Sequence, residues 1–165
     1  MSSIREEIEK LKIRGQEVIA RLGLDKASPN QQLINEVLSY DAAMLYNLTD
    51  YNISTYIVAL GQYLVMLQVY KNQLEMLSNA ASRKLEFELS KKKLMSDSKV
   101  KMNEKDRRVL ELISDDSLMD ASQLIDEFQI EQTLLTNISD ALEELLNSLK
   151  KEKSSRDLER QYGNR

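Results

Sequence analysis

The sequence contains no cysteine, histidine or tryptophan, and its 165 residues include only four glycines and one proline. Without cysteine the chain has neither disulfides nor thiolate metal sites. Without histidine it lacks the commonest general base and a frequent metal ligand. The scarcity of glycine and proline leaves few places for turns, and a charged fraction of 30% is typical of long helices. We therefore expect an all-α protein.

The sequence also lacks the signals of secretion and of membrane insertion. The N-terminus, "MSSIREEIEKLK", has no apolar run of the kind that precedes a signal-peptide cleavage site. The most apolar window, residues 51–82, contains only two charged residues, Lys71 and Glu75, but several asparagines and glutamines interrupt it. Because a membrane span needs about 20 predominantly apolar residues, we expect a cytoplasmic protein that does not bind membranes.

Residues 51–81 are the stretch around which the chain is organised. Tyrosine and leucine each recur every seventh residue, and interleaved they are spaced alternately three and four apart: Tyr56, Leu60, Tyr63, Leu67, Tyr70 and Leu74. This alternation is a heptad seam, which drives a helix onto a long helical partner as in a coiled coil. Further apolar residues make the surface wider than one seam needs. We therefore expect a partner helix in the same chain and further copies of the chain, in a homo-oligomer.

The first part of the chain, residues 1–50, is predicted to form additional N-terminal helices. Apolar residues in the same alternation predict an amphipathic helix over 3–22. A linker over 23–28 follows. Ser28 and Pro29 then mark the start of a second helix over 29–48, since serine is a favoured cap and proline fits the first helical position.

The second part, residues 51–165, is predicted to form a long antiparallel helical hairpin. Its segments are a long helix over 51–95, a loop over 96–103, a short helix over 104–113 and a long helix over 117–160. The polar residues 47–52 predict either a kink before the hairpin or a break recapped by Thr49 or Asp50. Asn103 or Ser98 is expected to cap the short helix.

Charge is segregated along the chain, although the formal net charge is only −4. Residues 83–108 carry ten basic and five acidic side chains, whereas residues 109–149 carry ten acidic and no basic ones. The basic stretch is open to three interpretations. It forms a surface for the phosphate backbone of nucleic acid, a solvated helix end that complements the helix dipole, or a partner for the acidic stretch, within one chain or between subunits.

Two further groups of residues are candidates for function. The tyrosines of the seam could stack on bases, but a seven-residue spacing on an apolar face is more typical of a core or a subunit interface. The carboxylates that cluster near the start of the last helix are Asp115, Asp116, Asp120, Asp126 and Glu127. Metal-dependent catalysis needs converging carboxylates and a substrate pocket, and acidic residues are favoured at a helix start in any case. We therefore expect no catalytic residue, no metal and no cofactor.

The predicted hairpin has a characteristic order of segments. A long helix has an aromatic and aliphatic half, "YIVALGQYLVMLQVYKNQLEML", which runs into a basic half, "ASRKLEFELSKKK". A polar loop, a short helix opened by "NEKDRRVLEL" and a long acidic helix ending in "SSRDLERQYG" follow. Over about residues 55–162 this order resembles the phage recombination mediators of the UvsY type. Residues 1–50 have no counterpart in this pattern.

This resemblance implies a helical subunit that assembles into a ring, binds single-stranded DNA and helps to load a RecA-type recombinase past single-strand-binding protein, in the cytoplasm of a phage's host. The DNA-contacting segment of the family would correspond to Arg83, Lys84, Lys91, Lys92 and Lys93. The negative net charge departs from what is usual for a DNA-binding protein. DNA contact would therefore rest on this single block.

The alternative is a protein-binding adaptor or inhibitor, which would engage a host complex through its acidic helix. Ten carboxylates without a cation could imitate a nucleic-acid backbone or dock on a basic surface. The two hypotheses differ in which charged block is exposed. The mediator needs residues 83–93 exposed, whereas the adaptor needs residues 115–144 exposed and the basic block neutralised.

Overall fold

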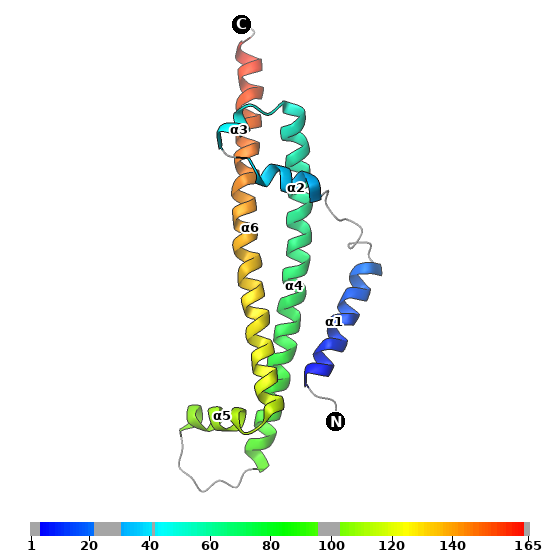
Figure 1. Ribbon diagram of the computed structural model, residues 1–165, viewed down its shortest axis with the longest axis vertical. Helices are drawn as coiled ribbons and strands as arrows, with labels where there is room; N and C mark the ends of the chain where they lie inside the picture. Colours follow the sequence, from blue (N-terminus) through cyan, green and yellow to red (C-terminus); the bar gives the residue numbers. More distant parts are fainter. Residues whose placement is uncertain (1–3, 22–30, 41, 96–102, 164–165) are drawn as a thin grey trace. The chain divides into compact units, whose positions relative to one another are not determined.

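The computed structural model describes residues 4–21, 31–40, 42–95 and 103–163, and within these ranges it contains six helices and no strand. In chain order the helices are α1 (Ile4–Arg21), α2 (Gln31–Leu38), α3 (Ala42–Tyr46), α4 (Asp50–Met95), α5 (Glu104–Ile113) and α6 (Asp116–Gly163) (Figure 1). The expected all-α class is confirmed, and α4 and α6 are the two long helices. The predicted linker over 23–28 and most of the predicted loop over 96–103 lie outside the described residues.

The predicted single helix over 29–48 is instead two helices, α2 and α3. After Leu38 the chain turns, and the Ser39 hydroxyl donates a hydrogen bond to the Glu36 carbonyl at 2.6 Å. The backbone N–H of Tyr40 bonds to the Val37 carbonyl, at 3.3 Å, in a tight turn rather than a continuing helix. Serine side chains compete with the helical backbone for its carbonyls, and this competition ends α2 at Leu38.

Each later helix begins at a residue whose side chain accepts a hydrogen bond from the first turn. Thr49 accepts one from the N–H of Asn52 at 3.2 Å, so the chain breaks before α4 and Thr49 caps the new helix. Asn103 accepts one from the N–H of Asp106 at 2.8 Å and caps α5. Asp115 accepts one from the N–H of Ser117 at 3.0 Å and caps α6.

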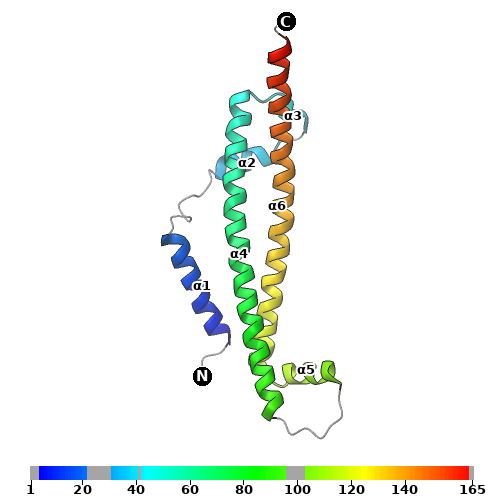
Figure 2. The same ribbon diagram turned by 180° about the vertical axis from the view of Figure 1, so that it is seen from behind.

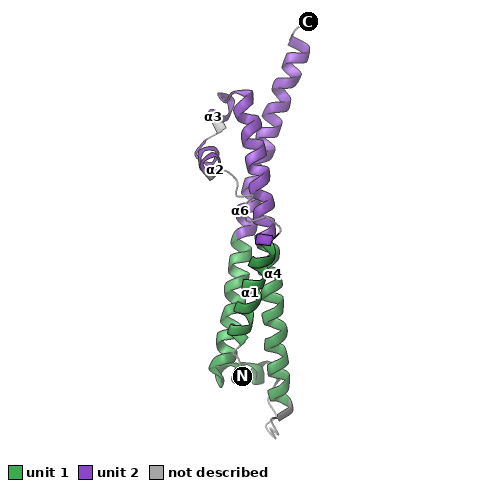
Figure 3. Ribbon diagram, turned by 90° about the vertical axis from the view of Figure 1, so that its right-hand side faces the viewer, with its two compact units in different colours: residues 1–19, 71–134 green, residues 20–70, 135–165 purple. Residues whose placement is uncertain are grey.

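The chain divides into two compact units (Figure 3). Unit 1 comprises residues 1–19 and 71–134, and unit 2 comprises residues 20–70 and 135–165. Both long helices contribute a segment to each unit. In each unit the α4 segment and the α6 segment run side by side in opposite directions (Figures 1 and 2).

The core of unit 2 joins α2, the first half of α4 and the last part of α6. Its most completely buried side chains are Ile34 and Val37 of α2, Ile53, Tyr56 and Leu60 of α4, and Leu142 and Leu149 of α6. The three-four spacing places these residues on one face of each helix. Fully burying one such side chain stabilises the fold by about 1.5–3 kcal/mol. Packing, rather than helix propensity, therefore holds this unit together.

The residues of the heptad seam are not equally buried. Leu60, Leu67, Leu74 and Tyr56 are buried, Tyr63 is half-buried against the core of unit 2, and Tyr70 is 47% exposed. A buried hydroxyl needs a hydrogen-bond partner. The Tyr56 hydroxyl has one, because it lies 3.1 Å from the Tyr40 hydroxyl, which itself bonds to Glu36. Within the described part of the chain, the hydroxyls of the other two tyrosines have no protein partner, which suits their more exposed positions.

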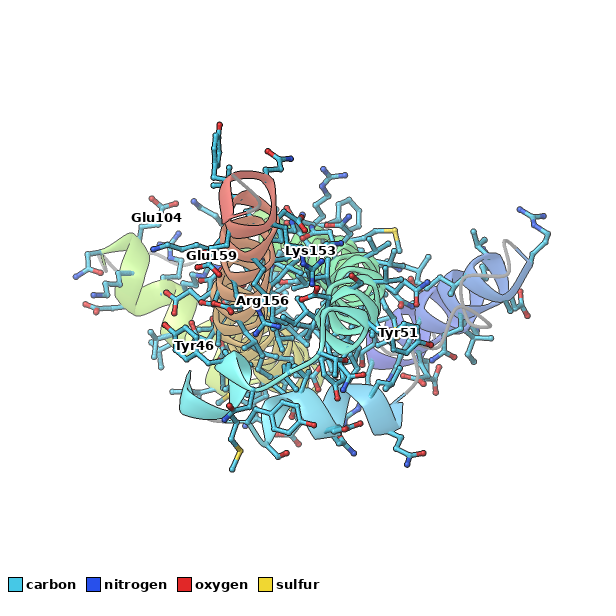
Figure 4. The ribbon with its side chains drawn as sticks, turned by 90° about the horizontal axis from the view of Figure 1, so that it is seen from above. Tyr46, Tyr51, Glu104, Lys153, Arg156 and Glu159 are labelled. Atoms are coloured by element: carbon cyan, nitrogen blue, oxygen red, sulfur yellow. The ribbon has the colours of Figure 1, made fainter. Side chains whose placement is uncertain are left out.

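An arginine near the end of α6 secures the break before α4 in unit 2. The Arg156 guanidinium donates hydrogen bonds to the backbone carbonyls of Tyr46 and Leu48 and to the Asp50 carboxylate (Figure 4). It also pairs with Glu152 one turn earlier, at 2.7 Å. The planar guanidinium can serve several acceptors at once, and it satisfies carbonyls left unpaired at the end of α3.

Unit 1 is built on the second half of α4, with α1 beside it. Its buried side chains are Ile4 and Ile8 of α1, Leu74, Leu77, Ala81, Leu85 and Leu89 of α4, and Leu118, Ala121, Ile125 and Phe128 of α6. At Gly15 the two helices approach closely, because a Cβ atom there would lie 2.9 Å from the Gln73 amide nitrogen. The two buried side chains of α1, Ile4 and Ile8, belong to its first two turns, close to Glu7, which pairs with Lys84 of α4.

Residues Asp50–Lys93 of α4 are long and apolar enough, by length and composition, to cross a membrane. The core helix of a soluble protein has the same properties. Part of this apolar surface is already covered by protein, since Ile53, Leu60 and Leu67 are buried in unit 2.

Candidate nucleic-acid interface

The five cations predicted to bind DNA lie near the C-terminal end of α4, all within unit 1. Arg83 and Lys93 are exposed, and Lys84, Lys91 and Lys92 are half-buried. An α-helix turns by about 100° per residue, so these positions spread around α4 instead of forming one face. Lys84 therefore pairs with α1, whereas Lys92 and Lys93 reach the start of α6 and α5.

Each of the four lysines has a carboxylate partner in unit 1. Lys84 pairs with Glu7 of α1, Lys91 with Glu88, Lys92 with Asp115 at the start of α6, and Lys93 with Glu104 of α5. Arg83 has no ion pair within the described part of the chain. Among the described residues, Asp115 is the one acidic residue of 109–149 that pairs with the basic block, so within this part of a single chain the two charged blocks meet at one point.

These ion pairs are on the surface, which limits their strength. The Lys84 side chain keeps 37% of its exposed area and the Lys93 side chain 51%. Exposed pairs contribute about 0–1 kcal/mol each, because water screens the charges and both side chains lose freedom. A phosphate group can therefore replace the carboxylate at each lysine, at a modest cost in free energy.

Two of the paired carboxylates have lowered pKa values. The hydrogen bond from Lys92 holds the pKa of Asp115 below its ordinary value, and the N–H groups of Leu118 and Ser117 act in the same direction. The hydrogen bond from Lys93, at 2.9 Å, likewise lowers the pKa of Glu104. Both carboxylates are thus charged at neutral pH and compete with phosphate for their lysines.

One face of α4 carries an aromatic ring between cations. Phe87 is 67% exposed, whereas Leu85 and Leu89, two positions to either side of it, are buried. It lies four residues after Arg83 and four before Lys91, so the three share a face, here called the cation–aromatic row. Phe87 is two positions from each buried leucine, or about 200° around the helix, which places it opposite the core.

A cavity of about 670 Å³ lies beside this row, between the start of α1, the end of α4 and the start of α6. Ile4, Phe87 and Leu118 give it an apolar part. Its charged lining is balanced, with Arg83, Lys84 and Lys92 opposed by Glu7, Glu88 and Asp115. The site therefore offers an aromatic surface and cations, but the cations reach a ligand only in competition with these carboxylates.

The outward face of α6 in unit 1 has the opposite character. Asp116, Asp120, Asp126, Glu127 and Glu131 are exposed and make no ion pair among the described residues. Ile130 and Leu134 are exposed beside them and line a shallow groove with Asp126. This acidic and apolar face is the strongest competing candidate for a binding surface.

The acidic cluster does not form a metal site within the described residues, where no group of three or more carboxylates could hold a metal ion. The Asp115 carboxylate already caps α6 and binds Lys92. The other four carboxylates are exposed and are spread over more than two turns of one helix: Asp116, Asp120, Asp126 and Glu127. Side chains that spread along a single helix do not converge on one point, so they offer no place for two-metal chemistry.

Comparisons with family models, curated proteins and solved structures find no match for this chain.

Sequence reasoning did not single out Phe87 as a functional residue. The available signal was its spacing, because cations lie four residues before and four after it, and a helix places such positions side by side. Leu85 and Leu89 lie on the other side of the helix, where they are buried.

Proposed function

We propose that the protein binds single-stranded DNA through the basic end of α4 and acts, without catalysis, as an accessory factor in DNA recombination. The observation that carries the proposal is the cation–aromatic row of Arg83, Phe87 and Lys91, beside Lys84, Lys92 and Lys93. Sequence-independent binding of single strands combines cations along the phosphate backbone with aromatic rings that face the bases. The role in loading a RecA-type recombinase past single-strand-binding protein rests on the resemblance to the UvsY-type mediators.

Self-association forms part of this proposal. In unit 2, Tyr51, Val58 and Val65 are exposed and spaced seven residues apart on α4, so they form an apolar stripe on one face. Their neighbours on the same face, Ser54, Thr55 and Gln62, are uncharged. Such a stripe fits a second copy of the chain. Several copies held together would present several weak DNA sites at high effective concentration, which raises the overall affinity.

The first experiment measures binding of a labelled single-stranded oligonucleotide by fluorescence anisotropy at several salt concentrations. For single strands the slope of log affinity against log salt is about −0.7 per neutralised phosphate. The variant Lys91→Ala/Lys92→Ala/Lys93→Ala should therefore flatten the slope by about 2. Light scattering should give a mass of several chains for both proteins.

The matched control is Lys150→Ala/Lys151→Ala/Lys153→Ala, which removes the same three charges from α6 in unit 2. It should leave the slope unchanged. An equal flattening in both variants would show that net charge, and not the end of α4, governs binding. Absence of binding at low salt by the wild-type oligomer would overturn the proposal.

The second candidate function is the protein-binding adaptor, which the exposed acidic face of α6 favours. Asp126, Glu127 and Glu131 surround Ile130 and Leu134, an arrangement suited to a basic amphipathic helix of a partner protein. The ion pairs of the α4 lysines also favour this candidate. If the oligomer binds no DNA, Ile130→Asp/Leu134→Asp becomes the informative variant, because it should abolish capture of such a partner.

A further inference from the structure

We infer that Phe87 is a base-stacking residue. The basic end of α4 then contacts the exposed rings of unpaired bases as well as the phosphates of the single strand. This inference deepens the proposed function and rests on it. Phe87 is the sole aromatic residue that α4 contributes to unit 1, it is 67% exposed, and it lies on the face opposite the buried Leu85 and Leu89. The ring does not enter the core of unit 1, and it lines the cavity beside Ile4 and Leu118.

The surroundings of Phe87 identify the chemistry of its ligand. On a helix the neighbours of a residue are those three and four positions away, which here are Arg83, Lys84, Ser90 and Lys91. Three of these four neighbours on α4 are cations, and the apolar residues near the ring, Ile4 and Leu118, come from α1 and α6. The core of a protein–protein interface is depleted of charge and rich in apolar residues, so this ring is poorly placed to anchor a protein. A nucleotide fits, because its base has a π-face and its phosphates carry negative charge.

The contrast with the apolar stripe of unit 2 supports this assignment. The nearest neighbours of Val58 on the helix face are Ser54, Thr55, Gly61 and Gln62, none of which is charged. That stripe suits a second copy of the chain, whereas the cation–aromatic row suits a polyanion with planar groups. A base on Phe87 would have its flanking phosphates near Arg83 on one side and Lys91 on the other. The cavity between α1, α4 and the start of α6 leaves room beside the ring.

The test uses the absence of tryptophan from the chain. In the variant Phe87→Trp the new side chain is the sole tryptophan, and its fluorescence should be quenched when an oligothymidine is added to the oligomer. An abasic oligonucleotide of the same length supplies phosphates without bases and should cause no quenching. Tyr162→Trp places an equally exposed probe on α6 in unit 2, outside the apolar stripe, and the oligothymidine should leave its fluorescence unchanged.

Affinity provides the second measurement. Stacking of one base on an aromatic side chain is worth about 1–3 kcal/mol, so Phe87→Leu should weaken binding by about 5- to 150-fold per site. The slope of log affinity against log salt should stay unchanged, because no phosphate contact is lost. Phe87→Tyr keeps the ring and should restore most of the affinity.

Each failure has a distinct meaning. If wild-type protein binds DNA with a steep salt dependence, but the fluorescence of the Phe87→Trp variant is not quenched and Phe87→Leu binds normally, the stacking inference is wrong and the proposed function stands. If the fluorescence of the Phe87→Trp variant instead changes with protein concentration in the absence of DNA, Phe87 is a subunit contact and the inference is overturned. If wild-type protein binds no DNA at all, the proposed function fails and the inference fails with it.

Discussion

Replacing the carboxylates that pair with the α4 lysines tests whether these carboxylates compete with DNA for the lysines. The alternative is that the end of α4 has no DNA site. The variant is Glu7→Gln/Glu104→Gln/Asp115→Asn. It keeps the size of each side chain, and the asparagine introduced by Asp115→Asn can still cap α6, because asparagine and aspartate are comparable N-caps. Each substitution removes the partner of one lysine of the predicted DNA-binding set.

The magnitude follows from the exposure of the three pairs. A partly exposed pair contributes about 0.2–1 kcal/mol, so DNA binding that disrupts the pairs of Glu7 and Asp115 loses up to about 2 kcal/mol in the wild type. The fully exposed Glu104 pair adds little to this loss. The variant has no such pairs to lose. Since 1.4 kcal/mol corresponds to a factor of ten, we expect its affinity for single-stranded DNA to rise by up to about 30-fold. The same substitutions should lower the free energy of unfolding by a similar amount at most.

The assay is anisotropy titration of a labelled oligonucleotide, together with urea denaturation of both proteins. The matched control is Asp126→Asn/Glu127→Gln/Glu131→Gln, which removes three carboxylates of α6 that make no ion pair in the described structure. It produces the same change in net charge, and the gain in affinity should be clearly smaller. Equal gains in both variants, or no gain in a folded triple variant that binds DNA, would refute the competition argument.

Three further predictions concern stability. Leu60→Ala, at a fully buried position of unit 2, should lower the free energy of unfolding by about 2–5 kcal/mol in urea denaturation, whereas Leu158→Ala, at an exposed position of the same unit, should change it by less than about 0.5 kcal/mol. Arg156→Ala should lower the free energy of unfolding by about 1–3 kcal/mol, because it leaves backbone carbonyls without their donor. Arg156→Lys should not restore this stability, since an ammonium lacks the planar fork of a guanidinium. Hydrogen exchange at the start of α4 measures the loss. Lys92 lowers the pKa of Asp115, so the ionised Asp115 carboxylate stabilises the folded chain. This stabilisation is present above pH about 4 and is lost as the pH falls through the lowered pKa. The stability difference between wild type and Asp115→Asn should therefore vanish at low pH.

The parts of the fold that depend on local pattern were predictable. The leucines at Leu60, Leu67 and Leu74 are buried, because a seven-residue repeat needs only the geometry of one helix to define a face. The caps of α5 and α6 follow from polar side chains just before an apolar run, and Asn103 and Asp115 make these hydrogen bonds.

The remainder depends on contacts that the sequence does not place. The break between α2 and α3 arises from one hydroxyl, that of Ser39, whose choice of acceptor is not visible in the periodicity. Arg156 could not be assigned, since its acceptor Leu48 lies 108 positions away. The five predicted DNA-binding cations were treated as one block, whereas the turn of the helix directs Lys92 and Lys93 to different partners from Arg83. Charge runs in sequence therefore overstate the size of a surface patch.

The core of unit 2 has a consequence for the synthesis of the chain on the ribosome. Ile34, Val37, Ile53 and Leu60 leave the ribosome early, but the buried α6 side chains of this core begin at Leu142. At a translation rate of about 5–20 residues per second, the apolar face of α4 stays uncovered for roughly 4–15 seconds before the α6 residues that bury it are synthesised. A nascent chain that stops before residue 142 exposes this face permanently. Premature termination within α6 should therefore yield aggregating or rapidly degraded fragments, even though most of the helices are already complete.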